Sequence, residues 1–287
     1  MAAIMDVPRG IAALIAFAFG ACVGSFVNVV AYRLPRGISI VAPRSFCPNC
    51  KNAIPFWANI PIFAYLGLRG RCAVCGASIP FRYFLIELAL ASAAAYLYLN
   101  FAPLDALARY LLCAGLFIAA LIDYDWRVIP NVITFPGIPT GMLAAWWVMP
   151  EVGWKSSIAG IVIGAGFLFV TGEAYLRIRG REGVGMGDVW LLGMVGAFLG
   201  LPGALFTLFA GSIIGTIGAI AVAVSGEHLQ PLHEPLPGTI AEVMASAAPD
   251  EEASRFLQTE IPFGPFLALA AGIFALFQPA LIDWYAR

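Results

Sequence analysis

Long hydrophobic runs, separated by short polar segments, fill most of this 287-residue chain. A helix needs about 20 apolar residues, each rising about 1.5 Å, to cross the hydrocarbon core of a bilayer. The sequence predicts eight membrane-spanning segments, at 11–31, 84–101, 106–122, 132–149, 157–176, 189–201, 203–224 and 264–284. The sixth of them is the shortest. The pattern therefore predicts an all-α polytopic membrane protein.

The composition agrees with a membrane environment. The chain is 61% hydrophobic and 11% charged, and its mean hydropathy is +0.87. A soluble domain is about half apolar and about a quarter charged, so the surplus apolar surface is expected to face membrane lipid. The formal net charge is -1, and the few charges are segregated in polar segments. This balance does not indicate nucleic-acid binding, and no nucleic acid is expected as a partner.

The basic residues predict how the segments are oriented, because Lys and Arg concentrate in the cytoplasmic loops of membrane proteins. We place the N-terminus outside. Four of the 16 Lys and Arg residues then fall on the outer side, namely Arg9, Arg109, Lys155 and Arg287, and the other twelve fall inside. We therefore expect both termini outside and the polar segment 33–82 in the cytoplasm.

The segment 33–82 contains two Cys-x-x-Cys pairs, 47-CPNC-50 and 72-CAVC-75, with 21 residues between them. This spacing is typical of zinc ribbons, in which each pair forms a knuckle and four thiolates complete a closed tetrahedral site. We predict a structural Zn²⁺ site with the ligands Cys47, Cys50, Cys72 and Cys75. Two disulfides are the alternative, but they require an oxidising compartment, whereas the charge pattern places this segment in the cytoplasm.

Acidic residues stand at the ends of two predicted spans. Asp123 and Asp125 follow the third span, and Asp188 follows Gly185 and Gly187 at the start of the sixth. In the predicted topology both places face the cytoplasm, so Asp123 and Asp188 are able to meet at one depth. Two aspartates that share a site repel each other when both are ionised, so one keeps its proton. Such a pair hydrolyses peptide bonds: the ionised member activates water, and the protonated member donates to the carbonyl oxygen.

Other functions fit the same acids. Asp125 and Arg127 are better interpreted as an interfacial ion pair than as part of a site. Asp123, Asp188 and Glu173 would also suit a proton- or cation-coupled membrane transporter, in which carboxylates form a relay. A third interpretation is a membrane assembly scaffold, in which the cysteine knuckles dock a partner and the acids are structural. Loss of peptide cleavage on replacement of either aspartate would separate a hydrolase from both alternatives.

A set of sequence stretches makes the chain similar to the type IV prepilin peptidases, the leader peptidase/N-methyltransferase family of Gly-x-Gly-Asp intramembrane aspartyl proteases. The stretches are both cysteine pairs and 24-GSFVNVVAYRLP-35, 59-NIPIFAYLGLRGRC-72, 79-IPFRYFLIE-87, 122-IDYDWRVIPN-131, 183-GVGMGDVWLLGMVGAFLG-200 and 261-IPFGPFLALA-270. They occur in the family's order and cover nearly the whole chain. The combination is far more specific than any one stretch.

The resemblance implies an aspartic endopeptidase in the bacterial inner membrane. Such an enzyme removes the short basic leader from type IV prepilin or pseudopilin precursors at the cytoplasmic face. Matched by position, the catalytic pair is Asp123, seven residues before Pro130, and Asp188 of the Gly-x-Gly-Asp motif. Asp125 takes a commonly acidic but non-catalytic place. The sequence does not distinguish among the precursors, and it leaves the oligomeric state open.

The resemblance also implies N-methylation of the new N-terminal residue, with S-adenosylmethionine as the methyl donor. The positions that match this activity are Gly70 and Arg71, within 69-RGRC-72, and Glu87. We expect these three residues in the methyl-transfer region. An interfacial ion pair of Glu87 with Arg82 or Arg69 is the alternative role for this acid.

Two positions depart from the family's pattern. Arg71 stands where Lys is usual, and although the charge is kept, Arg and Lys are not interchangeable. Trp190 stands two residues after Asp188, where the family usually has Lys, so a cation is missing near that acid. Neither change removes a catalytic acid. Leader cleavage is therefore the more secure of the two predicted activities.

The chain is expected to have three parts. Residues 1–32 form the first transmembrane helix, 33–82 form the cytoplasmic zinc-binding domain, and 83–287 form the transmembrane peptidase domain. Within the last part, the polar stretch 225–262 contains several prolines and an acidic cluster. It is interpreted as a cytoplasmic insertion that acts as a solvated linker.

Overall fold

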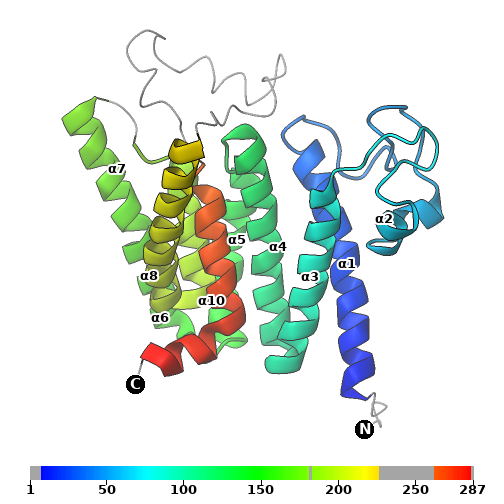
Figure 1. Cartoon of the computed structure of the whole chain (residues 1–287). Helices are drawn as coiled ribbons and strands as arrows, with labels where there is room; N and C mark the ends of the chain where they lie inside the picture. The colour runs from blue at the N-terminus through cyan, green and yellow to red at the C-terminus, as the bar shows by residue number, and fades with distance from the viewer. Residues whose placement is uncertain (1–7, 181–182, 226–261, 286–287) are drawn as a thin grey trace. The chain divides into compact units, whose positions relative to one another are not determined.

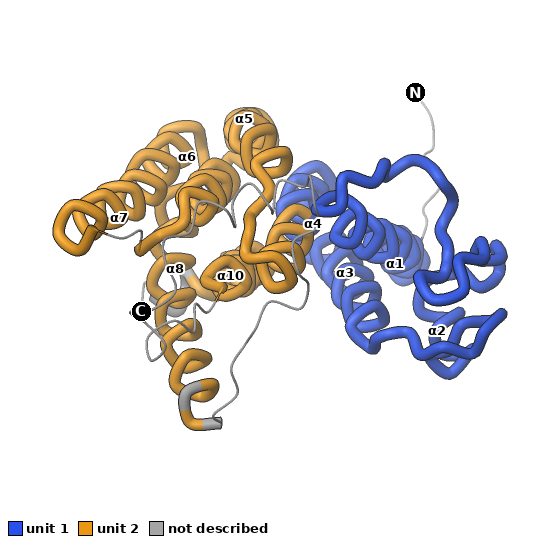
Figure 2. Tube along the Cα trace, turned by 90° about the horizontal axis from the view of Figure 1, so that it is seen from above, with its two compact units in different colours: residues 1–114 blue, residues 115–287 orange. Residues whose placement is uncertain are grey.

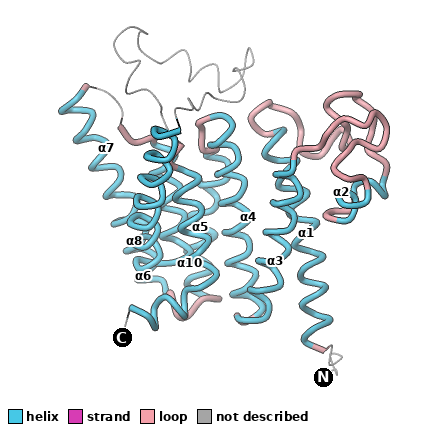
Figure 3. The backbone as a smooth tube through the Cα atoms, in the orientation of Figure 1, coloured by secondary structure: helices cyan, strands magenta, loops and turns pink. Residues whose placement is uncertain are grey.

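The protein folds almost entirely into helices. A computed structural model describes residues 8–180, 183–225 and 262–285 (Figure 1). In these residues the regular elements are helices, and the loops carry only two isolated β-bridges (Figure 3). The predicted all-α class is confirmed. The chain divides into two compact units, residues 1–114 and 115–287 (Figure 2).

The first unit combines membrane helices with a long looped segment. Its helices are α1 (Arg9–Arg33), the 3-10 helix η1 (Phe56–Asn59), α2 (Phe63–Gly67), α3 (Phe81–Asn100) and the first part of α4 (Pro103–Trp126). The segment between α1 and α3 carries both cysteine pairs together with η1 and α2 (Figure 3).

Glycines let α1 and α3 pack closely in antiparallel directions. A Cβ at Gly20 would lie 2.6 Å from the carbonyl oxygen of Leu90, and one at Gly24 would lie 2.7 Å from Cα of Glu87. Backbones in a membrane approach this closely only where the interface residues are small. The end of α1 is therefore held beside the start of α3, and the loop between them begins and ends at one place.

The second unit contains the last part of α4 and the remaining helices. They are α5 (Asn131–Trp147), α6 (Gly153–Gly160), the π-helical turn η2 (Ile161–Ala165), α7 (Gly166–Arg179), α8 (Met186–Ser225) and α10 (Gly264–Tyr285). Helices α6, η2 and α7 follow one another without a break over 27 residues. Near the end of α7, Glu173 and Arg177 form a surface ion pair of 2.8 Å.

Helix α8 is folded into two antiparallel arms at Gly200. The backbone there is non-helical, with φ of 68° and ψ of -170°, a conformation that favours glycine. Leu192 and Ala204 reveal the reversal, because side-chain atoms of both lie within 4 Å of the Cβ position of Gly164. In a straight helix their Cα atoms would be about 18 Å apart. The second arm of α8 therefore runs back toward the start of the first arm, where Asp188 lies.

The helices correspond to the predicted membrane spans. Six helices in the described ranges are long and apolar enough to cross a membrane, namely Arg9–Arg33, Phe81–Asn100, Pro103–Trp126, Gly153–Arg179, Met186–Val222 and Gly264–Leu281. Helix α5 has 17 residues, the lower limit for a span, and α8 contains two arms. Counting α5 and both arms recovers the eight predicted segments. Most of the predicted insertion at 225–262 lies outside the described residues.

Candidate active site and cysteine cluster

Asp123 lies in the last turn of α4, with 7% of its surface exposed. Its Oδ2 atom accepts a 3.1 Å hydrogen bond from the backbone N–H of Gly264, the first residue of α10. This approach requires glycine, because a Cβ at position 264 would lie 2.6 Å from the same oxygen. The start of α10 therefore fixes the orientation of the Asp123 carboxyl group.

Asp188 lies in the first turn of α8, where the helix dipole favours a negative group. The N–H of Asp188 bonds to the Gly185 carbonyl at 3.1 Å, and its Oδ2 lies 3.6 Å from the Cβ position of the same glycine. Its Oδ1 is buried and has no hydrogen-bond partner among the described residues. A buried polar atom normally has a partner, so this oxygen is available to a water molecule or a substrate group.

Ile129, just before α5, packs against the residues next to both acids. A Cβ at Gly187 would lie 2.9 Å from Cβ of Ile129, and one at Gly264 would lie 3.0 Å from its Cδ1. Because Gly264 bonds to Asp123 and Gly187 precedes Asp188, Ile129 links the surroundings of the two carboxyl groups. The fold thus brings the ends of α4, α8 and α10 together, and with them the two acids that the sequence predicts as a pair.

Two other residues from the sequence predictions lie close to this pair along the chain. Asp125 is buried, with 4% of its surface exposed. Trp190 packs edge-on against Phe135 of α5, with ring centroids 5.0 Å apart. The position where the resemblance leads one to expect a lysine is therefore part of an aromatic contact between α5 and the first arm of α8.

Each cysteine pair forms a tight hairpin of the same shape. In the first, the N–H of Lys51 bonds to the Cys47 carbonyl at 2.9 Å, and in the second, the N–H of Gly76 bonds to the Cys72 carbonyl at 3.0 Å. Lys51 and Gly76 both have left-handed backbone conformations, with φ of 59° and 71°. Each hairpin turns its two sulfur atoms in the same direction, as a zinc knuckle does.

The two hairpins bring their four sulfur atoms together. All four Sγ atoms lie within 4.8 Å of one another, and those of Cys47 and Cys75 are 3.9 Å apart. A tetrahedral site with Zn–S bonds of about 2.3 Å needs sulfurs about 3.8 Å apart. The described cysteines are all free thiols. The set is thus compatible with a four-thiolate zinc site and differs from the alternative of two disulfides.

Backbone N–H groups in the hairpins stabilise the thiolate form. Those of Cys75 and Val74 lower the pKa of the Cys72 thiol from its ordinary value to about 6, and that of Asn52 lowers the pKa of the Cys50 thiol. Zinc binds the thiolate and not the thiol. The hairpin backbone therefore favours metal binding at neutral pH.

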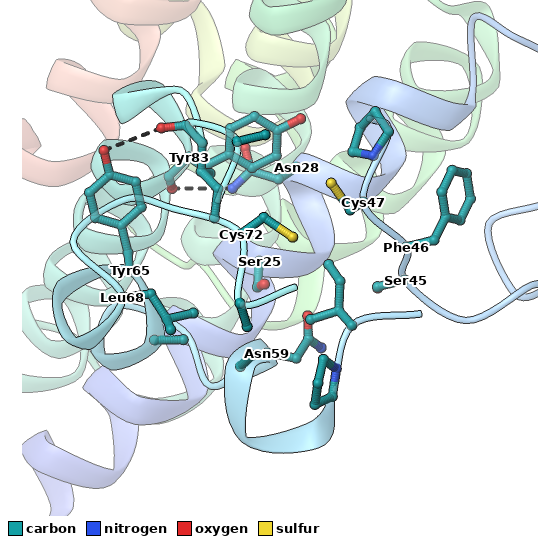
Figure 4. A pocket seen from close by; sticks show the side chains of 18 of the residues that line it. Ser25, Asn28, Ser45, Phe46, Cys47, Asn59, Tyr65, Leu68, Cys72 and Tyr83 are labelled. Carbon is teal, nitrogen blue, oxygen red and sulfur yellow. Dashed lines mark hydrogen bonds between the residues drawn. The ribbon is translucent and has the colours of Figure 1, made fainter. Parts of the chain in front are cut away.

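A cavity of about 440 Å³ lies between the cysteine hairpins and helices α1 and α3 (Figure 4). Many of its lining side chains are apolar or aromatic, with a few polar groups among them, a composition common in small-molecule sites. Its polar lining includes Ser25, Asn28, Asn59 and Glu87. The Asn28 amide donates a 3.2 Å hydrogen bond to the Tyr83 carbonyl, which joins α1 to α3 at the cavity wall (Figure 4).

The three positions predicted for methyl transfer lie in different surroundings. Glu87 is buried and lines the cavity, and its Oε2 accepts a 2.7 Å hydrogen bond from the N–H of Ile62. Gly70 and Arg71 are not among the lining residues that the structure describes; they lie at the base of the second hairpin. Gly70 has φ of 66°, and a Cβ there would lie 2.8 Å from the Tyr65 hydroxyl.

Three contacts at these sites were not predicted from the sequence. They are the bond from Gly264 to Asp123, the packing of Ile129 and the bond from Ile62 to Glu87. All five residues lie in stretches that carry the family resemblance, namely 59–72, 79–87, 122–131 and 261–270, which hinted that they matter. Nothing in those stretches indicates which atoms meet, because each contact joins segments far apart along the chain.

Comparison with known proteins agrees with the chemistry of these two regions. The bacterial peptidase A24 N-terminal domain matches residues 18–101, and the type IV leader peptidase family matches residues 110–220. Three relatives are named prepilin leader peptidase/N-methyltransferase. The one from Burkholderia pseudomallei strain K96243 is 32% identical, over 96% of this chain and 89% of its own length. The one from Myxococcus xanthus strain DK1622 is 32% identical, over 96% and 92%.

The third, from Aeromonas hydrophila, is 30% identical over 99% of this chain and 98% of its own length. No solved structure matches the chain. The two matching family domains follow each other along the sequence, one over the cysteine hairpins and the other over both aspartates. The chain therefore belongs to the type IV leader peptidase family.

Proposed function

We propose that this protein cleaves the leader peptide from type IV prepilin or pseudopilin precursors, with Asp123 and Asp188 as the catalytic acids. The observation that carries the proposal is that α4, α8 and α10 bring these two carboxyl groups into one partly buried site. The names of the relatives and the matching family support the same chemistry. The positive-inside distribution of Lys and Arg supports cleavage on the cytoplasmic side of the inner membrane.

In the proposed mechanism the two carboxyl groups have different roles. Asp123 accepts a hydrogen bond from the backbone N–H of Gly264, and such a bond stabilises a carboxylate. We assign Asp123 as the ionised member, which takes a proton from the attacking water. Asp188, whose Oδ1 has no partner in the described structure, then donates its proton to the oxygen of the scissile carbonyl.

The test compares three matched substitutions. Asp123→Asn and Asp188→Asn keep the size of the side chain and remove the acid, so each should abolish conversion of a prepilin precursor to the shorter product on a gel. Asp125→Asn is the control, because Asp125 is also a buried acid in the last turn of α4 and has no proposed role in catalysis. Cleavage that survives either of the first two changes, in protein that remains folded, would overturn the proposal.

The alternative functions receive less support. A transporter that relays protons would use Glu173 together with the two aspartates, but Glu173 is paired with Arg177 at an exposed surface of α7. A scaffold would not need two buried carboxyl groups held together by the ends of three helices. The peptidase explains both aspartates and the family match together.

We also propose that the protein methylates the new N-terminal amine with S-adenosylmethionine, and that the cavity beside the cysteine hairpins is the place of transfer. The cavity volume of about 440 Å³ suits a cofactor of this size, and the Glu87 carboxyl group lines it. Gly70 and Arg71 are proposed to act from beside the cavity, by shaping the second hairpin. The name shared by the relatives supports this second activity.

Methyl transfer is tested separately from cleavage. A precursor that has already been cleaved, incubated with labelled S-adenosylmethionine, should acquire label with the parent protein and with Asp188→Asn. It should lose label with Tyr83→Ala, which removes a ring from the cavity wall. Equal labelling by the parent and Tyr83→Ala would argue against this cavity.

Zinc is proposed to hold the two cysteine hairpins together, with Cys47, Cys50, Cys72 and Cys75 as its ligands. When bound, the ion would supply a rigid cross-link and no catalytic chemistry, because four thiolates leave no open position. The cytoplasmic placement of this segment is part of the proposal, since free thiols persist in a reducing compartment. Metal analysis of purified protein should find one zinc per chain.

A further inference from the structure

An uncharged stretch lies between the two cysteine hairpins. Residues 52–68, NAIPFWANIPIFAYLGL, contain no acidic or basic side chain, whereas Lys51 precedes them and Arg69 and Arg71 follow. Large apolar side chains in this stretch are exposed: 80% of the surface of Phe56 and 72% of that of Phe63 is uncovered. A stretch of 10–14 apolar residues is too short to span a bilayer but suits a re-entrant or interfacial segment.

Contacts within the first unit show how deep the stretch reaches. Ile62 packs between Ala21 of α1 and Ala91 of α3, next to Phe17 and Leu88. Ala91 lies ten residues inside α3, about 15 Å from its start, and Ala21 lies twelve residues before the end of α1, about 18 Å from it. Ile62 is therefore alongside the candidate membrane spans of both helices and not beyond their ends. Helix α2, which follows Ile62, is drawn beside α1 and α3 in Figure 1.

The stretch enters and leaves on the same side. Tyr65, three residues after Ile62, packs against Phe81 and Phe84 in the first turn of α3, with ring centroids 6.2 Å and 5.4 Å away. The chain thus descends to Ile62 and rises again through α2. One side of α2 is covered by α3, and Phe63 and Leu66 on its other side remain uncovered.

Glu87 stabilises the lowest point of this path. Its Oε2 accepts the 2.7 Å hydrogen bond from the N–H of Ile62, where the backbone has φ of 64° and ψ of -58°. A positive φ is rare for a β-branched residue, so the bond holds an unfavourable conformation in place. A backbone N–H without a partner is expensive at membrane depth, where non-helical chain survives only if its polar groups are satisfied.

We infer that residues 55–68 form a re-entrant segment whose exposed apolar side chains contact the acyl chains of the bilayer. Apolar side chains at the start of α3, a candidate membrane span, are exposed as well, among them Phe81 and Leu85. Lys51 and Arg69 stand where the segment meets the headgroups, and such side chains extend toward the interface. The inference concerns lipid contact alone and does not depend on the proposed catalytic activities.

The re-entrant segment also forms part of the cavity wall. Pro55, Asn59, Ala64, Tyr65 and Leu68 all belong to the segment and line the cavity. The cavity therefore has a lipid-supported wall, and the zinc knuckles attach to both ends of that wall. Part of the segment 33–82, expected from the sequence to be a cytoplasmic domain, lies in the membrane in this account.

The test places a photoreactive residue, p-benzoylphenylalanine, at position 63 or 66 of the full chain in native membranes. Position 74, in the second hairpin, is the matched control, because Val74 is similarly exposed at 56%. After illumination, mass spectrometry should find several-fold more phospholipid adducts at 63 and 66 than at 74. Each labelled protein is first checked for zinc content and for an unchanged gel-filtration profile in detergent.

The outcomes separate lipid from other occupants. Lipid adducts at 63 and 66 that are no more frequent than at 74 would overturn the inference, and so would adducts mainly with a second copy of this chain or with a soluble protein. The two positions are independent, so a folding defect at one leaves the other as the test. A lack of lipid adducts would not bear on leader cleavage. Conversely, the Asp123→Asn and Asp188→Asn variants, which should not cleave, should still form the lipid adducts.

Discussion

The cysteine cluster of the first unit and the aspartate pair of the second are both assembled from residues far apart in the sequence, but by different means. Each cysteine hairpin is a local structure: five residues set the turn, and both turns have the same hydrogen bond and left-handed residue. The aspartates have no such local unit. They come together only because α4 ends, α8 begins and α10 begins at the same place.

This difference determines how each site should respond to change. A metal that joins two local hairpins can be removed and restored, and its loss should be confined to the loop. A site made of helix ends is fixed by close packing, so a single added methyl group can displace a carboxyl group without removing any functional atom.

Removal of zinc should have the largest effect in the first unit. Cys75→Ser removes one of the four ligands, and a chelator removes the ion. Either change frees a loop with little apolar core of its own, and such loops unfold without metal. We expect loss of zinc, protease sensitivity within 39–80 and loss of methyl transfer, measured by metal analysis, limited proteolysis and label incorporation. Cys113→Ser is the matched control, because Cys113 is buried in α4 and is not one of the four ligands. This variant should keep the metal.

Lower pH should have the same effect as the chelator, because the thiolate is the form that binds zinc. The Cys72 thiol has a pKa lowered to about 6, so it stays ionised above that value and gains a proton as the pH falls through it. Because bound zinc itself favours the thiolate, its release should require a lower pH than protonation of the metal-free thiol: zinc should be retained at pH 7 and lost progressively in acid. A zinc content that does not change between pH 7 and strong acid would contradict a site made of four thiolates.

Gly264→Ala should abolish most cleavage while leaving the zinc in place. The added Cβ would lie 2.6 Å from Oδ2 of Asp123 and 3.0 Å from Ile129, so the carboxyl group or α10 must move. A misplaced acid–base group costs about 10²-fold or more in rate. The measurement is the initial rate of leader removal at saturating precursor, with label incorporation as the second readout.

Gly272→Ala is the control for this prediction, because it lies in the same helix and a Cβ there meets nothing within 4 Å. It should cleave at the parent rate. If Gly264→Ala cleaves as fast as Gly272→Ala, the contact between α10 and Asp123 is not needed for catalysis. The helix-end account of the aspartate site would then lose its main support.

These cases indicate how far the sequence could predict the molecule. Hydrophobic run lengths predicted the helices, and the cysteine spacing predicted the cluster, since both patterns reflect interactions among near neighbours. For the reversal of α8 at Gly200, the sequence indicated only a break between the predicted spans 189–201 and 203–224. It did not indicate which residue makes the turn, because a left-handed glycine looks the same in sequence as a helical one. The partners of Asp123 and Glu87 required the fold, since each bond joins distant segments.

Gly24→Ala should have an intermediate effect, on the first unit alone. Its Cβ would lie 2.7 Å from Cα of Glu87, so α1 and α3 must separate and the wall of the cavity must shift. Overpacking of this kind costs about 1–3 kcal/mol. We expect a lower thermal midpoint and weaker methyl transfer, with cleavage near the parent rate.

Gly10→Ala lies in the same helix and meets nothing within 4 Å, so it should match the parent in both assays. Cleavage that falls together with methylation in Gly24→Ala would show that the two sites are coupled. The cysteine region and the aspartate region would then not be functionally independent.

Trp190→Ala should have the smallest effect, because it removes an edge-on contact with Phe135 and no charge. Such an aromatic pair contributes about 0.5–1.5 kcal/mol beyond its buried area. Trp190→Phe should keep most of the contact, and Trp190→Lys should lose it while restoring the cation that the family usually has at this position. If the indole serves only to pack α5 against α8, the three variants should order by thermal midpoint, Phe above Ala and Lys, with cleavage rates little changed. A Lys variant that cleaves faster despite a lower midpoint would instead mean that charge beside Asp188 governs the reaction, and that this arm of α8 does more than hold the acid in place.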